Sequence, residues 1–351
     1  MTENSVSPSR QKTDYLRGVA ILTVVINHFV NVYAYDSAGG YANGMISVFF
    51  ILSGYGIFFS LSKGLQTYSL SRLIVTYWQR RFLRIYPLLW IYLFFDDKFQ
   101  LNLMEFLALD FFRPAIPWFV PAILQCYISA PFFFLLLKKL GVKSYCVVLL
   151  TGFIALNLIL FYRGIPNVPA IAYHGYHGFF FSHILLFGAG LVIAHLSSMK
   201  QKNLSNGKAY FIILLFVMFL HETTPQTNIH FSGSIIVLEV FFLMFSILCV
   251  YSILNSTIYL PFSRLFQGLG IYSYSIYLFH RYYFKGVQKI VILERYDLSI
   301  ESILIVILLL PLFIVSLAYF EEIINGVANR NFNLKDVTRK YYSNLFLKKV
   351  R

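Results

Sequence analysis

Two ionisable residues share one face of the first apolar segment. Arg17 and His28 are eleven positions apart, which at about 100° per residue is roughly 20° more than three whole helical turns and about 16 Å along the axis. One helix face would therefore join the membrane edge to mid-membrane. An ionisable group within a membrane-crossing helix is costly and is a functional candidate by default. The alternative is that His28 only forms a hydrogen bond to a neighbouring helix.

A second basic feature precedes the third apolar segment, where Arg80, Arg81 and Arg84 occur together. Arg81 and Arg84 are three positions apart and share a helix face. Guanidinium groups bind phosphate with two parallel hydrogen bonds, so these side chains together with Arg17 are candidates to hold a phosphorylated cofactor at the inner membrane surface. Taken alone, arginines at a cytoplasmic helix end are usually topology determinants.

The composition indicates that these residues are positioned by membrane helices. The chain has 351 residues, 58% hydrophobic and 19% aromatic but only 13% charged, where soluble domains carry about 25%. So few charges cannot cover the apolar surface of a soluble protein, and 26 Tyr with 37 Phe exclude a disordered chain. We therefore predict an all-α, polytopic integral membrane helix bundle.

Ten segments are candidates for transmembrane helices, because a bilayer core about 30 Å thick needs roughly 20 apolar residues per helix. They are 15–34, 44–62, 82–95, 118–137, 145–162, 179–197, 209–221, 233–254, 268–290 and 302–320. The segment 99–112 is apolar but interrupted by charged residues, which indicates an interfacial or re-entrant piece.

The basic residues predict the orientation. With the N-terminus inside, 22 of the 29 Lys and Arg residues lie in cytoplasmic segments, as the positive-inside rule requires. Both termini are then cytoplasmic, and the net charge of +14 needs no nucleic-acid partner. The predicted domains are an N-terminal segment (1–13), a membrane domain (14–322) and a basic tail (323–351) that suits an anionic lipid surface.

Five motifs in order resemble the bacterial acyltransferase 3 family of integral-membrane acyltransferases. They are Asp14-x-Leu-Arg17-x10-His28, Phe49-Phe50-Ile-Leu-Ser53-Gly54-Tyr55, Arg80-Arg81-x-x-Arg84-Ile-Tyr-Pro87, Trp118-Phe119-Val-Pro-Ala-Ile-Leu124-x-x-Tyr127-x-x-x-Pro131 and Leu269-Gly270-x-Tyr-Ser273-Tyr274-x-Ile-Tyr277-Leu278-x-His280. The resemblance spans about residues 14–320. Tyr15 stands where the family commonly has Gly.

The resemblance implies a multi-pass enzyme of the bacterial cytoplasmic membrane. Its reaction would move an acyl group, usually acetyl from acetyl-CoA, onto a hydroxyl of an extracytoplasmic or lipid-linked glycan. Acyl-CoA would be a substrate, and no permanently bound cofactor is expected. The nucleotide phosphates would meet Arg17, Arg81 and Arg84 at the cytoplasmic side, while the flexible arm of the donor reaches toward His28.

In family terms His28 is the essential histidine, either a general base on the acceptor hydroxyl or a transient acyl carrier. We favour the base, because a neutral imidazole can take a proton at physiological pH. Asn27 and Asn31 lie about 100° and 60° from the direction of His28, so Asn31 is the better orienting partner. The competing hypothesis is a polysaccharide or solute transporter or flippase, since polar helix faces also line transport paths.

The remaining motif residues are possible channel or substrate contacts. Aromatic residues near helix ends are more often interfacial or core residues. The assignment as channel or substrate contacts therefore rests on the family pattern. The residues concerned are Asp14, Ser53, Trp118, Tyr127, Tyr277 and His280.

Three further features fall outside the motifs. Glu239 is an intramembrane carboxylate without a partner in the sequence pattern. His174, His177 and His183 have the spacing of no standard metal motif, so we expect no metal site and interpret them as part of an outward aromatic loop that contacts glycan. The three cysteines lie within apolar runs and imply neither a disulfide framework nor a thiolate metal site.

Overall fold

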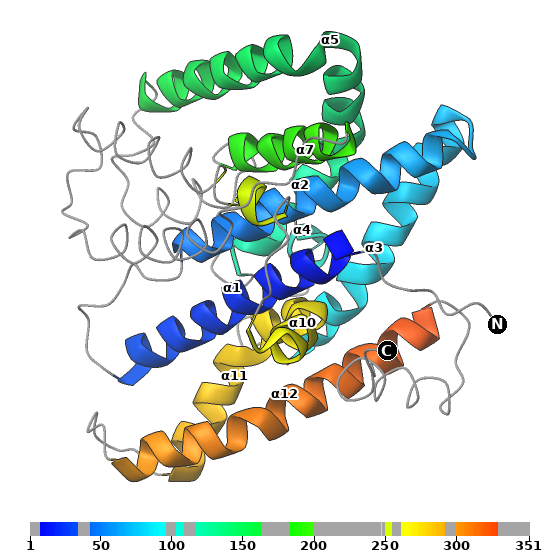
Figure 1. Cartoon of the computed structure of the whole chain (residues 1–351). Helices are drawn as coiled ribbons and strands as arrows, with labels where there is room; N and C mark the ends of the chain where they lie inside the picture. Colours follow the sequence, from blue (N-terminus) through cyan, green and yellow to red (C-terminus); the bar gives the residue numbers. More distant parts are fainter. Residues whose placement is uncertain are drawn as a thin grey trace.

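The computed structural model describes residues 8–33, 43–95, 103–108, 117–162, 183–199, 247, 250–254, 261–291 and 300–328 (Figure 1). Every regular element within these residues is an α-helix, which agrees with the predicted all-α class. The helices are α1 (Pro8–Tyr33), α2 (Asn43–Leu65), α3 (Leu70–Phe94), α4 (Leu103–Phe106), α5 (Phe119–Tyr162), α7 (Ile184–Ser198), α10 (Ser263–Ile271), α11 (Ser273–Val291) and α12 (Ile300–Ala328).

Three helices in the described part are long and apolar enough to cross a membrane. Their apolar stretches are Met45–Leu65 of α2, Phe119–Ala155 of α5 and Leu308–Val327 of α12, and α7 is a shorter apolar helix. Helix α1 has 26 residues, but its first half carries four charged residues. The predicted spans 209–221 and most of 233–254 lie outside the described residues, so the number of ten stays a prediction.

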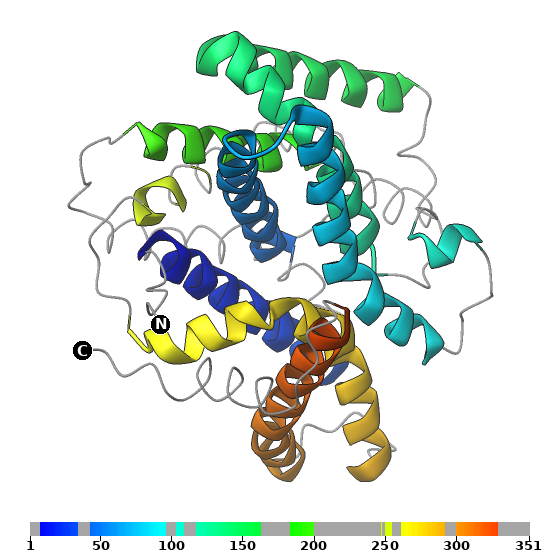
Figure 2. The same ribbon diagram turned by 90° about the vertical axis from the view of Figure 1, so that its right-hand side faces the viewer.

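Two expected helix boundaries differ from the structure. The segments 118–137 and 145–162 follow each other in α5, interrupted at Gly141, whose φ of 72° and ψ of 171° suit glycine. The single span expected at 268–290 is instead two helices, α10 and α11, which meet at an angle at Tyr272 (Figure 2). At this bend, the Tyr272 hydroxyl donates a hydrogen bond to Glu322 Oε1 of α12 (3.3 Å).

Helices α2 and α7 approach so closely that only glycine fits at their contact. A Cβ added at Gly54 would overlap the backbone carbonyl of Phe187, and one at Gly190 would overlap the carbonyl of Ile51. Small residues at such contacts let membrane helices pack backbone to backbone. Gly54 follows Ser53 in the second motif, so this contact fixes the position of Ser53 on α2.

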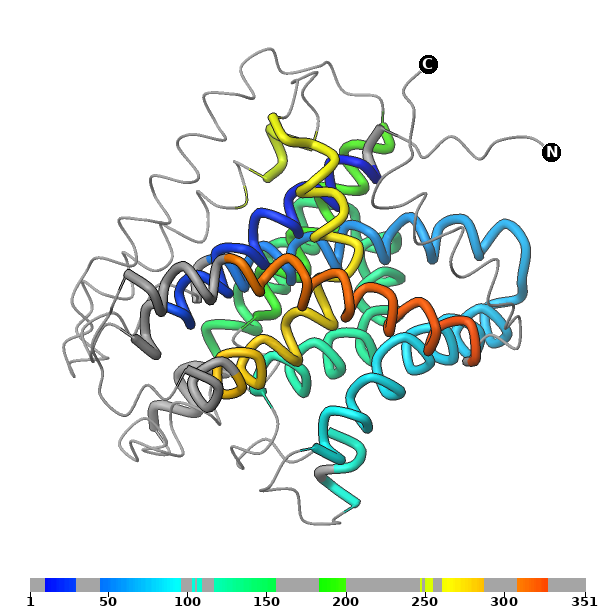
Figure 3. Tube along the Cα trace, turned by 90° about the horizontal axis from the view of Figure 1, so that it is seen from below, coloured from blue at the N-terminus to red at the C-terminus, as the bar shows by residue number. Residues whose placement is uncertain are grey.

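Helices α1 and α10 make a second contact of this kind (Figures 2 and 3). A Cβ at Gly18 would overlap the backbone of Phe266, and one at Gly270 would overlap the backbone of Asp14. The ring of Tyr15 packs edge-on against Phe266 at 5.1 Å. Because α10 is held against the first turns of α1, it fixes the part of α1 that carries Asp14.

The helix ends predicted to be cytoplasmic lie toward one side of the molecule. The first turn of α1, the connection between α2 and α3, and the end of α12 all point to the right in Figure 1. The basic residues of α1 and α3 can therefore meet at one end of the bundle. The cytoplasmic location of this side stays a prediction from the basic residues.

Candidate functional site

A cavity of about 700 Å³ opens among α1, α2, α3, α5, α10 and α11. Most of its wall is formed by the motif residues of these helices. The lining residues are Arg10, Thr13, Asp14, Arg17, Ile46, Phe49, Ser53, Tyr55, Gly56, Phe59, Arg81, Arg84, Ile85, Phe119, Ile123, Tyr127, Ile271, Ser273, Tyr274 and Tyr277. The structure thus brings Arg17, Arg81 and Arg84 to one space, together with Asp14, Ser53, Tyr127 and Tyr277.

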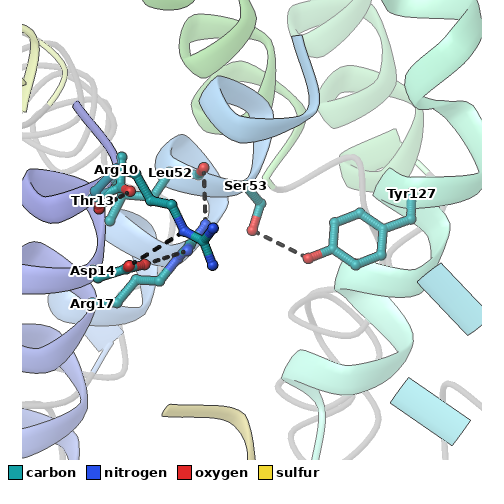
Figure 4. A network of polar contacts seen from close by, with 7 residues as sticks. All are labelled: Arg10, Thr13, Asp14, Arg17, Leu52, Ser53 and Tyr127. Atoms are coloured by element: carbon teal, nitrogen blue, oxygen red, sulfur yellow. Dashed lines mark hydrogen bonds and ion pairs between the residues drawn. The ribbon is translucent and has the colours of Figure 1, made fainter. Parts of the chain in front are cut away.

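The α1 side of the cavity carries a network centred on Asp14 (Figure 4). Its carboxylate pairs with Arg17 Nη1 at 3.3 Å and with Arg10 Nε at 3.8 Å. Arg17 Nη2 also donates to the carbonyl oxygen of Leu52 on α2 at 3.4 Å. Asp14 and Leu52 therefore hold the Arg17 guanidinium between the two helices, at the wall of the cavity.

The opposite side combines a guanidinium with aromatic rings. The Arg81 guanidinium carbon lies 5.6 Å from the centre of the Tyr77 ring and 5.3 Å from that of Tyr127, distances at which cations are attracted to ring faces. The Tyr127 hydroxyl and Ser53 Oγ form a hydrogen bond of 3.4 Å between α5 and α2 (Figure 4). Tyr127 is thereby fixed from two directions.

The charges around the cavity favour an anion. Its lining residues include four arginines and one aspartate, so positive charge exceeds negative charge by three. Arg84 is exposed, in contrast to Arg17, whose side chain is only 20% exposed. Planar guanidinium groups that converge from two helices suit phosphate oxygens.

His28 lies near the cavity but is not among its lining residues. Its ring centre is 4.8 Å from that of His280 on α11, with the ring planes inclined by 39°. His280 is 2% exposed, and its ring centre is 6.0 Å from that of Tyr277, which does line the cavity. The structure therefore places the two motif histidines together, one side chain away from the arginine-lined space.

Two other residues that the sequence marked as candidates, His183 and Trp118, do not line the cavity. The ring of His183, at the start of α7, stacks on Phe50 at 4.1 Å and on Trp118 at 5.4 Å. His183 is 8% exposed, so the interpretation of this residue as part of an outward loop is wrong: aromatic stacking buries it. Trp118 packs there and not on the cavity.

Some expected site features fall outside the described part of the chain. These are His174, His177, Glu239 and the side chain of Asn31. Asn27 is described: it is buried, and its Oδ1 has no hydrogen-bond partner among the described residues. Within the same residues, no three His, Cys, Asp or Glu side chains lie close enough to hold a metal ion.

Two buried carboxylates of α12 were missed by sequence reasoning. Glu321 and Glu322 are each 4% exposed. Glu321 interacts with Ser275 of α11 and with the charge of Arg84, whereas Glu322 accepts the hydrogen bond from Tyr272. Two consecutive carboxylates at the edge of an apolar run were an available signal, but they fall at the boundary between the predicted last span and the tail.

Comparison with known protein families identifies the family of this chain. The family model described as an acyltransferase domain matches residues 11–321 of the 351. No curated protein and no solved structure matches the chain. The matched region contains every lining residue of the cavity except Arg10, as well as His28, His280 and Glu321. Because the match covers most of the sequence, the chain belongs to the acyltransferase 3 family.

Proposed function

We propose that this membrane acyltransferase moves an acetyl group from acetyl-CoA to a hydroxyl of an extracytoplasmic or lipid-linked glycan. The observation that carries the donor assignment is the convergence of Arg17, Arg81 and Arg84 on one cavity of about 700 Å³. This volume is within the range of about 300–1,000 Å³ for small-molecule sites. The donor phosphates would bind the arginines from the cytoplasmic side.

His28 is proposed as the general base of the transfer. As the acceptor hydroxyl oxygen attacks the thioester carbonyl, His28 takes its proton; the carbon–sulfur bond then breaks and the leaving thiolate of coenzyme A receives that proton. The acyl group has then moved from the sulfur of coenzyme A to the acceptor oxygen, and the histidine is neutral again. The alternative, in which His28 itself carries the acyl group, predicts an acylated histidine in the absence of acceptor.

Membership of an acyltransferase family favours an enzyme over the transporter or flippase hypothesis. The proposed setting is the cytoplasmic membrane of a bacterium, where acyl-CoA is supplied from inside and the glycan acceptor is reached from the membrane or outside. Membrane lipid surrounds the helices, and no nucleic acid takes part.

The donor assignment is tested by binding of labelled acetyl-CoA to the purified full-length protein. Arg84→Gln should weaken binding about tenfold to a hundredfold, since a lost charge-assisted hydrogen bond costs about 1.5–3 kcal/mol. Arg80→Gln is the matched control, because Arg80 is exposed on the same helix and does not line the cavity.

A measurement of transfer completes this test. Inside-out membrane vesicles that hold the endogenous glycan are given labelled acetyl-CoA or labelled succinyl-CoA, and label in the glycan fraction is counted. Transfer from neither donor, or equal loss of binding in Arg84→Gln and Arg80→Gln, would overturn the proposed function.

A further inference from the structure

We propose that His280 is a positioning residue for His28: its Nε2 accepts a hydrogen bond from the His28 ring, which leaves the other nitrogen of His28 free to take the acceptor proton. This inference rests on the proposed function, in which His28 is the base. It is drawn from the backbone contacts of His280, its burial and its distance from His28.

The backbone of α11 determines where the proton of His280 resides. His280 Nδ1 lies 2.7 Å from the carbonyl oxygen of Tyr277 and 3.2 Å from that of Ile276. A carbonyl oxygen can only accept, so Nδ1 is the donor and carries the hydrogen. In a neutral imidazole the other nitrogen, Nε2, then has a lone pair and can only accept a hydrogen bond.

This lone pair is buried without a partner. His280 is 2% exposed, and Nε2 has no hydrogen bond among the described residues. Leaving a buried acceptor unpaired costs about 1–3 kcal/mol, so a nearby donor is favoured. The rings of Tyr277 at 6.0 Å and Phe284 at 6.2 Å surround His280 on other sides.

His28 is the ring closest to His280 among its measured aromatic neighbours. Two imidazoles joined by a linear N–H···N hydrogen bond of about 2.9 Å have centres about 5 Å apart. The observed separation is 4.8 Å, with an inclination of 39° between the planes. The proposed bond requires a His28 nitrogen to turn toward Nε2 of His280 as substrate binds.

Such a bond would fix both the tautomer and the direction of His28. The nitrogen that donates to His280 holds the hydrogen, and the opposite nitrogen keeps the lone pair needed by a general base. A carboxylate performs this task for the histidine of catalytic triads. Here a second histidine would perform it, because a backbone carbonyl has already made that histidine an acceptor.

The test compares two substitutions of His280 in the full-length enzyme. His280→Phe keeps a ring of similar shape but removes the acceptor, and His280→Gln places an amide oxygen near the former Nε2. We expect kcat to fall about a hundredfold in His280→Phe, as for a misplaced reacting group, with KM for acetyl-CoA unchanged. His280→Gln should restore most of kcat.

His195→Phe is the matched control. His195 is a partly buried histidine on α7 whose ring lies 5.6 Å from Phe58, and it does not line the cavity. Its substitution should leave kcat unchanged. Equal losses in His195→Phe and His280→Phe would show a general packing effect and overturn the inference.

A double substitution separates positioning from folding. If His280 acts only through His28, the pair His28→Ala with His280→Phe should be no slower than His28→Ala alone, because the effects of coupled residues do not add. Additive losses would overturn the inference while leaving the proposed function intact. Failure of the wild-type enzyme to transfer acetyl would instead count against the proposed function.

The wild-type protein offers a measurement that needs no substitution. Nitrogen-15 NMR of labelled histidine distinguishes protonated from unprotonated ring nitrogens. The inference requires a His280 signal with hydrogen on Nδ1 and an N–H···N bond to a second histidine when acetyl-CoA is bound. A His280 ring with hydrogen on Nε2 alone would overturn it.

Discussion

The side chains around the cavity divide into two groups with different tasks. Arg17, Arg81 and Arg84 supply the positive charge that suits a phosphorylated donor, whereas His28 and His280 form a pair beyond the wall residue Tyr277. In the proposed mechanism, anion binding and proton transfer would thus take place at separate positions in the bundle. Substitutions in the two groups should have different effects.

The first prediction concerns His28. His28→Ala should lower the rate of transfer about 10²–10⁴-fold, the usual contribution of general acid–base catalysis, while binding of acetyl-CoA is kept. In the wild type the rate should rise with pH as the histidine loses its proton, and this rise should be absent from the variant. Transfer assays and equilibrium binding measure the two properties. A variant with near-normal turnover would return His28 to a hydrogen-bonding role between helices.

The second prediction concerns Glu321. Its buried carboxylate lies within electrostatic reach of Arg84, so Glu321→Gln should remove negative charge near the arginines and strengthen acetyl-CoA binding by up to about fivefold, as for a charge interaction worth about 0.2–1 kcal/mol. Neither glutamate lines the cavity, and Glu322→Gln is the comparison because Glu322 accepts a hydrogen bond from Tyr272. It should change thermal stability with little effect on the Kd. If binding assays showed a changed Kd in Glu322→Gln and an unchanged Kd in Glu321→Gln, the electrostatic role of Glu321 would be contradicted.

The positions of these side chains depend on close contacts between helices. Gly54 and Gly190 bring α2 against α7, and Gly18 and Gly270 bring α1 against α10. The contacts hold the helices that carry Ser53 and Arg17. Motif glycines in this family pattern are therefore explained by backbone proximity and need no contact with substrate.

The third prediction tests this explanation. Gly54→Ala should destabilise the protein by about 1–3 kcal/mol or more, because a Cβ would overlap the Phe187 carbonyl and force the helices apart. Gly152→Ala is the matched control, since nothing lies within 4 Å of a Cβ at that helical position. Thermal unfolding in detergent compares them. Equal melting temperatures for both variants would mean that α2 and α7 can separate without cost.

Periodicity predicted which residues share a helix face but not which helix they meet. Arg17 and His28 were expected on one face, and Arg81 and Arg84 on another; the cavity unites the three arginines. The contact of His28 with His280 could not be derived, because the two residues are far apart in the chain and their contact depends on tertiary packing. The hydrogen bond between Tyr272 and Glu322 could not be derived for the same reason, because Glu322 lies on another helix.

In the proposed function, the whole bundle would link a cytoplasmic donor to an acceptor on the other side of the membrane. The donor hypothesis requires the arginine-rich end to face the cytoplasm, since acyl-CoA is made there. The strong bias of Lys and Arg toward the same side favours this orientation. An inverted protein would place Arg17, Arg81 and Arg84 where the donor is absent.

The last prediction is that both termini are cytoplasmic and that the segment 36–43 is outside. Ser37→Cys, made in a background with Cys126, Cys146 and Cys249 replaced by Ser, should react with a membrane-impermeant thiol reagent in intact cells. Ser71→Cys, at the exposed start of α3 beside the basic residues, is the opposite-side control and should react only in inside-out vesicles. Labelling of Ser37→Cys from the cytoplasmic side alone would invert the bundle, and the arginine-lined cavity could then not receive acyl-CoA from the cytoplasm.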